Sequence, residues 1–146
     1  MDIALTHPLP ANARLISQQF GENPDYYAQW QLAGHNGIDF AVPEGTPVAA
    51  AHTGRCWLAN DPRGYGQHIV LASDDGRYQT LYAHLSGFIA TPSEHVQAGQ
   101  VIGVSGDTGN STGPHLHFGV KIPGANPPYR DWVDPSPYLP IDQIAA

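Results

Sequence analysis

Glycine and proline interrupt this chain so often that they leave no room for a long helix. Sixteen glycines and fourteen prolines are spread over its 146 residues, and only 13% of the residues are charged. Glycine weakens a helix interior and proline breaks it, whereas both are common in the turns between strands. A chain divided by turns into many short pieces is typical of an all-β fold, which we expect here.

Three segments have the composition of β-strands that belong to the core. Residues 66–73 (GQHIVLAS) and 76–85 (GRYQTLYAHL) flank an acidic turn that ends at Gly76. An Asp-Gly step between two such segments is a strong hairpin signal, because the favoured two-residue turn needs positive φ. Residues 115–122 (HLHFGVKI) predict a final core strand.

The remaining segments are less regular. Residues 48–60 are consistent with strands around a bulge at Gly54. Residues 1–32 show no sustained period, and we expect an irregular N-terminal arm that wraps the domain. The C-terminal tail after residue 122 is rich in proline, which lacks a backbone N–H, so we expect no long strand or helix there. We expect this tail to pack through its aromatic residues Tyr129, Trp132 and Tyr138.

The length suits one domain, and we expect residues 1–146 to form a single domain that buries a core without disulfides. Cys56 is the only cysteine, which excludes an internal disulfide and a cysteine-rich metal site. Its neighbours Trp57 and Leu58 favour a small buried side chain in a strand over a catalytic thiol.

Charge and hydropathy exclude several partners. The formal net charge is −7, with six lysines and arginines in all, so we expect no nucleic-acid partner, because phosphate recognition needs a stripe of basic residues. No apolar segment approaches the roughly 20 residues that span a bilayer, so we expect no transmembrane segment. The first twenty residues lack the basic start and apolar stretch of an export signal, which leaves the compartment undecided.

Two short motifs place histidines and an aspartate at ligand spacing. His35 and Asp39 lie in GHNGIDF, four residues apart. The motif's glycines make a helix unfavourable, and in an extended segment residues an even number apart point the same way. His115 and His117 in GPHLHF share one face of a strand by the same period of two, while Leu116 points to the core.

Taken together, these motifs predict a zinc site. A catalytic zinc ion takes three protein ligands from His, Asp or Glu and leaves a fourth position to water, and two histidines with one aspartate satisfy that rule. His84 in LYAHL, taken alone, is typical of a structural histidine at a strand end. A His-x-His pair taken alone is often a pair of surface or hydrogen-bonded histidines, and a single aspartate is often a turn residue. The prediction of a metal site therefore depends on all three motifs occurring in one small chain.

Two other features have ordinary interpretations. Four further histidines lack a partner at ligand spacing, namely His7, His52, His68 and His95. The glycine-rich segment 105–115 (SGDTGNSTGPH) lacks the Gly-Lys-Ser/Thr that ends a phosphate-binding loop. We expect a tight loop whose backbone passes close to the metal strand or to an extended substrate.

The motifs, in this order, resemble those of the lysostaphin/LytM-type zinc metallopeptidases. The matching segments are HNGID (35–39), GTPV (45–48), YAHL (82–85) and GNSTGPHLHF (109–118), and the resemblance covers about residues 34–120. It implies a compact antiparallel β-sandwich or barrel-like domain of the duplicated hybrid motif kind, with the active site in a groove. It also implies a peptidoglycan peptide substrate, cut in cross-links or stem peptides, and hence action at the cell envelope.

Carried over residue by residue, the resemblance implies that His35, Asp39 and His117 hold Zn²⁺, while His84 and His115 flank the water and the scissile carbonyl. Zinc would make a nucleophile of that water near neutral pH. One free histidine would accept its proton and the other would donate to the oxyanion. We favour His115 as the base and His84 as the donor, and the order of the two stays open. No His-Glu-x-x-His motif supplies a glutamate base.

Two other functions are compatible with such a scaffold. A non-catalytic regulator of other wall hydrolases would share the fold, but the presence of all five site residues argues against it. A sugar-transport phosphocarrier would use a histidine pair, but Asp39 would repel a phosphohistidine. We expect a monomer, and delivery to the wall by another protein, for instance as a phage lytic factor, is a hypothesis.

Overall fold

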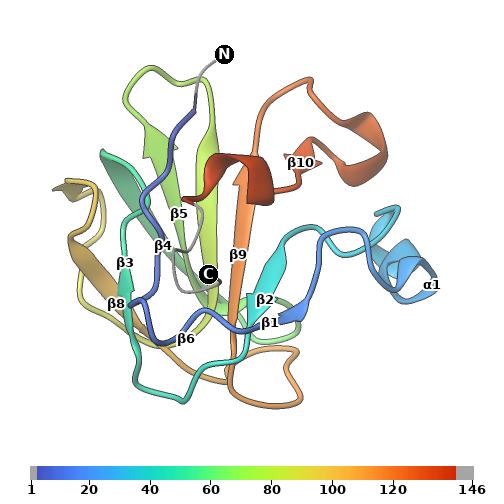
Figure 1. Ribbon diagram of the computed structural model, residues 1–146, viewed down its shortest axis with the longest axis horizontal. Helices are drawn as coiled ribbons and strands as arrows, with labels where there is room; N and C mark the ends of the chain where they lie inside the picture. The colour runs from blue at the N-terminus through green and yellow to red at the C-terminus, as the bar shows by residue number, and fades with distance from the viewer. Residues whose placement is uncertain (1–2, 141–146) are drawn as a thin grey trace.

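The structure of the protein is a computed structural model that describes residues 3–140 (Figure 1). Short strands dominate it, as the glycine and proline content predicts. In chain order the elements are β1 (Ile16–Gln18), α1 (Pro24–Tyr27), η1 (Ala28–Trp30), β2 (Ile38–Phe40), β3 (Pro47–Ala49), β4 (Gly54–Asp61), β5 (Gly66–Ser73), β6 (Gln79–Phe88), β7 (His95–Val96), β8 (Val101–Ser105), β9 (Leu116–Lys121), η2 (Pro127–Tyr129), β10 (Trp132–Val133) and η3 (Ser136–Tyr138).

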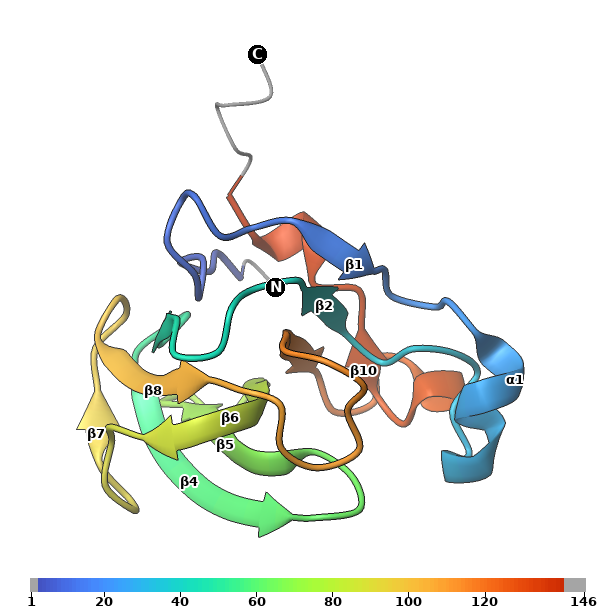
Figure 2. The ribbon, with the colours of Figure 1, turned by 90° about the horizontal axis from the view of Figure 1, so that it is seen from below.

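The strands of the described residues form one antiparallel sheet whose main path is β1-β2-β9-β6-β5-β4-β7. β10 pairs with β9, and β3 joins through β8. Figure 2 shows β4 and β8 on opposite sides of β5 and β6, so the sheet curves around its own core. The all-β class and the antiparallel arrangement are therefore confirmed.

β6 is the central strand, and it changes partner along its length. Residues 79–83 pair with β9, whereas Leu85 and the residues after it pair with β8. His84 lies at the change with φ 63°, a left-handed conformation that is uncommon for a residue with a side chain. The chain therefore twists sharply at His84, and this turns its side chain out of the regular alternation of the strand.

Both faces of β6 are buried, and each carries its own apolar cluster. The larger cluster lies inside the curved sheet and includes Tyr82, Phe40 and Phe118. The smaller one lies on the opposite face, where Leu81 and Ala83 pack with Leu32 and Trp132. A strand that is covered on both faces is buried along its length. Residues 80–85 of β6 are all buried, which agrees with this arrangement.

The hairpin prediction is confirmed, with a turn longer than two residues. β5 and β6 pair antiparallel, and Gly76 in their connection has φ 73°, as the Asp-Gly signal requires. Cys56 is fully buried in β4, as its neighbours indicated. The bulge expected at Gly54 is wrong: Gly54 begins β4 and pairs in regular register with Ser73.

The two ends of the chain cover the sheet differently from one another. The irregular N-terminal arm is only partly confirmed, because it contains β1, which pairs with β2, and the short helical turns α1 and η1. In the tail, Trp132 is 9% exposed and Tyr129 packs on Phe20 with ring centroids 4.6 Å apart, so the expected packing holds. Tyr138 packs against the larger cluster. No helix within residues 3–140 is long and apolar enough to cross a membrane.

Candidate active site

Three of the predicted site residues converge on one point. One ligand atom each from His35, Asp39 and His117 lies within 4.8 Å of the other two. Asp39 on β2 stands directly opposite His117 on β9 in the antiparallel ladder, and its Oδ1 is 2.9 Å from His117 Nδ1. Directly opposed residues have neighbouring Cβ atoms, so strand pairing alone brings these two side chains together.

His35 reaches the same point from the loop before β2. It is 1% exposed, and its Nδ1 donates to the Gln19 carbonyl at 3.0 Å. That hydrogen bond leaves the Nε2 lone pair facing Asp39 Oδ1 and His117 Nδ1, each 3.1 Å away. A metal-binding histidine is commonly oriented by such a bond from its other ring nitrogen.

The orientation of His117 is set by packing instead. A Cβ placed on Gly37 would lie 2.9 Å from His117 Nε2, so only glycine fits beside the ring. On another side, the ring stacks with Tyr65 at a centroid distance of 5.7 Å. Nε2 is buried and has no hydrogen-bond partner among the described residues. His117 therefore depends on Gly37 and Tyr65 for its position.

This group of atoms fits a divalent cation. Burial by itself would raise the pKa of Asp39, but contacts with the His117 and His35 rings outweigh burial and hold that pKa well below the usual range. A carboxylate and two imidazole lone pairs crowd together favourably only when a cation or proton lies between them. Two nitrogens and one oxygen are also the ligand set of many catalytic zinc sites.

His84 and His115 lie beside this group, with their ring centroids 4.6 Å apart. His84 Nδ1 donates to the Thr108 carbonyl at 2.7 Å, and His115 Nδ1 donates to the Gly113 carbonyl at 2.9 Å. Each Nε2 is thus the atom available for proton exchange. His115 Nε2 is 3.8 Å from Asp39 Oδ2, so the two predicted catalytic histidines adjoin the predicted ligands.

The protonation state of His84 follows from its surroundings. Burial lowers its pKa to about 4, although the Thr108 carbonyl acts in the opposite direction. His84 is therefore neutral at pH 7, and its Nε2 is a hydrogen-bond acceptor. His115 lies just before β9 and pairs with Gly106 through an isolated β-bridge. The prediction that His115 and His117 belong to one strand therefore holds only through this bridge.

A groove of about 730 Å³ passes over these side chains. One wall consists of Tyr26, Tyr27 and Trp30 from α1 and η1, and the other includes Asn110 from the glycine-rich loop. Asn110 Nδ2 donates to the Tyr26 hydroxyl at 2.8 Å, which joins the two walls. The loop thus lies against the site, as predicted for residues 105–115.

Sequence reasoning missed several groove residues. Tyr65 and Asn36 both line the groove, and Asn36 Nδ2 donates to the Tyr65 hydroxyl at 2.8 Å. Asn36 lies inside the GHNGIDF motif, which was a usable signal, whereas nothing near Tyr65 in the sequence marks it. Lys121, Arg130 and Trp132 also line the groove.

With this geometry in view, comparison with known proteins identifies the family. The family model described as Peptidase family M23 matches residues 33–134. The chain belongs to peptidase family M23. The match includes all five residues discussed above and extends through the tail strand β10.

Several curated M23 relatives are similar to this chain. The DD-carboxypeptidase/endopeptidase Mpg of Neisseria meningitidis serogroup B is 45% identical over 95 residues, which are 65% of this chain and 21% of that protein. The peptidoglycan DD-endopeptidase ShyA of Vibrio cholerae is 37% identical over 109 residues, 75% of this chain and 25% of ShyA. The chain thus spans about a quarter or less of the curated relatives it matches.

Solved structures agree with the family. Lysostaphin from Staphylococcus simulans superposes with a TM-score of 0.73 at 35% identity, over 88% of this chain and 50% of that one. A zinc-containing peptidase from Vibrio cholerae superposes with a TM-score of 0.74 at 32% identity, over 90% of this chain and 39% of that one. The lysostaphin-type recognition made from the motifs is therefore confirmed.

Proposed function

We propose that this chain is a zinc-dependent endopeptidase that hydrolyses peptide bonds in the cross-links or stem peptides of bacterial peptidoglycan. The observation that carries the proposal is the convergence of His35, Asp39 and His117, with two more histidines beside them. All of these residues except His35 line one groove. The relatives named as peptidoglycan endopeptidases support the substrate class.

In this proposal His35 Nε2, an Asp39 oxygen and His117 Nδ1 hold the zinc ion. When bound, zinc acts as a Lewis acid that lowers the pKa of a coordinated water toward about 7. The chain contributes the fixed positions of its ligand atoms. The Gln19 carbonyl holds the His35 ring, and Gly37 and Tyr65 hold His117 by packing.

His84 and His115 share the proton transfers. Because each Nδ1 donates to a backbone carbonyl, each ring accepts or releases a proton at Nε2. The ring that donates to the oxyanion must carry two protons at that step, and the ring that accepts the water's proton must begin neutral. His84 begins neutral at pH 7 because burial lowers its pKa to about 4. A pKa that low also makes His84 a weak base, so it does not decide between the two histidines, and our preference for His115 as the base is unchanged.

The groove supports a peptide substrate over a phosphocarrier reaction. Asp39 lies within 3.8 Å of His115 and 2.9 Å of His117, so a phosphoryl group on either ring would face a carboxylate. An extended peptide, in contrast, suits an open groove with aromatic walls and a glycine-rich loop. The retention of all five site residues also argues against a purely regulatory role.

The proposal is tested by digestion of purified cell walls that differ in their cross-bridges. Mass spectrometry of the released fragments identifies the bond that is cut. We expect zinc-loaded protein to release new amino termini, chelator-treated protein to release none, and added zinc to restore release. Unchanged release after complete metal removal would contradict the zinc mechanism. No release from any wall, with retained wall binding, would favour the regulator.

A further inference from the structure

The end of the groove beyond the predicted metal site carries two cationic side chains. Lys121 is the last residue of β9 and, by the alternation of the strand, faces the same way as His117. Four residues of strand separate the two Cα atoms by about 13 Å. Between them the Trp132 ring covers Gly119, where a Cβ would lie 2.9 Å from Cζ3. The Lys121 Nζ is 5.5 Å from the centre of that ring.

Arg130 also lines the groove, and it does so from a strained loop. Arg130 and Asp131 have φ values of 54° and 72°, two successive left-handed residues that are not glycine. Such conformations cost of order 1–3 kcal/mol each and persist only when surrounding contacts impose them. Asp131 supplies those contacts, because its carboxylate accepts the backbone N–H groups of Gly124 and Asn126. The loop therefore holds Arg130 at the groove against a local preference.

Within residues 3–140, the carboxylates near these two cations are bound to other groups. No ion pair joins Lys121 or Arg130 to a carboxylate of that region. Asp131 lies near Lys121, but both its oxygens are taken by backbone donors. Asp61 also lines the groove, and one of its oxygens accepts the Arg63 N–H while the other abuts Gly64.

This placement is unusual for so acidic a chain. The protein has six lysines and arginines and a net charge of −7, yet two of those six line this groove. Tyr65 adds a third polar group nearby. Burial raises the pKa of its hydroxyl, so it keeps its proton, while the oxygen accepts from Asn36. This part of the groove thus offers hydrogen-bond donors and two cations that form no ion pair with a carboxylate of residues 3–140.

We propose that Lys121 and Arg130 form a subsite for a free carboxylate of the substrate peptide, roughly three to four residues from the scissile bond, since an extended chain spans about 3.3–3.6 Å per residue. The inference rests on the proposed peptidase function and narrows its substrate class. The enzyme then prefers stem peptides with a free carboxyl group at that position over those in which the same group is a carboxamide. Arg130 can bind both carboxylate oxygens, and Lys121 adds a point charge.

The test uses the zinc-loaded protein and a set of cross-linked stem peptides in which each free carboxyl group is converted in turn to the carboxamide. For one position we expect kcat/KM to fall about tenfold or more on amidation, because a charge-assisted hydrogen bond is lost. Arg130→Gln and Lys121→Gln should remove this preference chiefly by raising KM for the carboxylate peptide. They should affect the amidated peptide less than the carboxylate peptide, so that the ratio of kcat/KM for the two peptides falls toward one.

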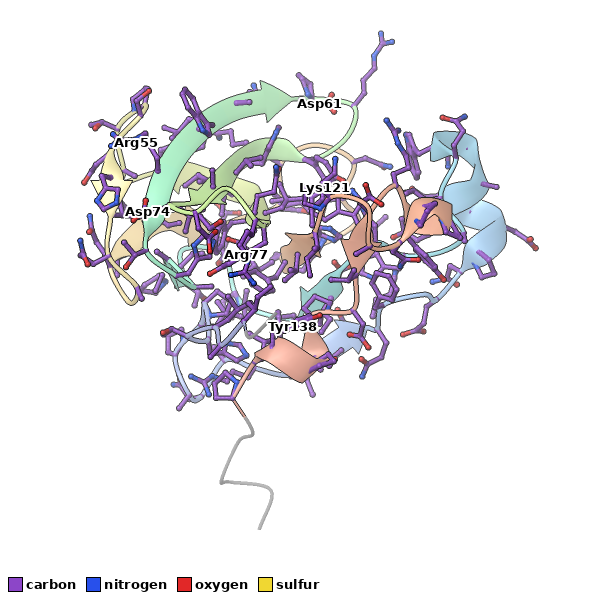
Figure 3. The ribbon with its side chains drawn as sticks, turned by 90° about the horizontal axis from the view of Figure 1, so that it is seen from above. Arg55, Asp61, Asp74, Arg77, Lys121 and Tyr138 are labelled. Atoms are coloured by element: carbon purple, nitrogen blue, oxygen red, sulfur yellow. The ribbon has the colours of Figure 1, made fainter. Side chains whose placement is uncertain are left out.

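Arg55→Gln is the matched control. Arg55 lies on β4, donates to the Ser93 carbonyl at 2.8 Å and is absent from the groove lining. Figure 3 labels Arg55 at the far left of the molecule and Lys121 near its centre. This variant should keep the full preference for the carboxylate. Equal kcat/KM for every amidated and free peptide in wild type would overturn the subsite.

A binding measurement separates failure of the subsite from failure of the proposed reaction. Calorimetry with the metal-free protein and the same peptides reports affinity without turnover. Tighter binding of one carboxylate peptide, lost in Arg130→Gln, would support the subsite even if no peptide were cleaved. Equal affinity for the carboxylate and carboxamide peptides, together with cleavage of both, would retain the peptidase and exclude the subsite.

Discussion

Three different kinds of contact hold the predicted metal ligands in place. The Gln19 carbonyl orients His35, the β2–β9 ladder places Asp39, and Gly37 with Tyr65 confines His117. His117 lacks a hydrogen bond from its second nitrogen within the described residues. Changes at Gly37 should therefore disturb His117 as directly as changes at the ligand itself.

Another buried histidine, His52, lies away from the groove. His52 is 5% exposed, its Nδ1 donates to the Thr53 carbonyl, and its Nε2 accepts from the Thr80 hydroxyl at 2.9 Å. Thr80 in turn contacts the Tyr82 hydroxyl at 2.7 Å, and Tyr82 accepts the Ala51 N–H. This chain of hydrogen bonds suits a neutral imidazole.

The pKa of His52 predicts a pH dependence of stability. Burial lowers the pKa of His52 in the folded chain below the ordinary histidine value of 6.5. Below that pH the unfolded chain binds the proton more readily than the folded chain, so stability is present above pH 6.5 and is lost as pH falls. In urea titrations of metal-free protein, the difference in unfolding free energy between wild type and His52→Gln should narrow by up to about 1 kcal/mol between pH 7.5 and 5.5. An unchanged difference would contradict this explanation.

At the residue scale the sequence predicted the site chemistry but not its surroundings. The spacing of His35, Asp39 and the His115/His117 pair indicated which side chains meet, because a period of two is a local property. His35, however, lies in a loop rather than a strand, and the left-handed φ of His84 has no local signal. Tyr65 reaches the site only through the packing of the whole fold.

At the scale of elements, the loop between β8 and β9 connects the fold to the site. Its Thr108 carbonyl accepts from His84, and its Thr108 hydroxyl donates to the Leu85 carbonyl at 2.7 Å. Gly109 packs against the backbone before β5, where a Cβ would lie 2.3 Å from Gly66 N, and its φ is 78°. Only glycine satisfies both conditions.

Gly109→Ala should therefore destabilise the protein and displace His84. We expect a loss of about 1–3 kcal/mol in unfolding free energy from strain and the close backbone contact. Activity should fall further than zinc content, because the loop holds His84 and not the ligands.

Gly113→Ala in the same loop is the control, since a Cβ there meets nothing within 4 Å. It should change stability by less than about 0.5 kcal/mol. Equal effects of the two substitutions would refute the role assigned to the Gly109 contact.

The elements themselves were predicted unevenly. The hairpin of β5 and β6 carried the Asp-Gly signal, so it was predictable from local sequence. β1 was not, because three residues have no periodicity of their own and form a strand only by pairing with β2. The bulge assigned to Gly54 was wrong. The register shifts among the described strands fall instead at Ile16/Gln18, Val48/Ala49, Gln67/Ile69 and Leu85/Gly87.

For the whole molecule, the curved sheet and the groove define what the chain can accommodate. β6 belongs to both halves of the sheet, and its change of partner at His84 places the site at the junction. The net charge of −7 predicted no nucleic-acid partner. In so acidic a chain, it is unusual that two of the six lysines and arginines line one groove. A sequence cannot show this pair, because Lys121 and Arg130 come to line one groove only through the folding of the tail loop.

The zinc content of three purified proteins tests the central claim most directly. Wild type and His84→Ala should each retain about one zinc per chain after dialysis, because three protein ligands remain. His117→Ala should lose most of its zinc, and both variants should lose activity, His84→Ala by about 10²–10⁴-fold as expected for an acid–base residue. Equal zinc content in wild type and His117→Ala would contradict the ligand set on which the proposed hydrolysis depends.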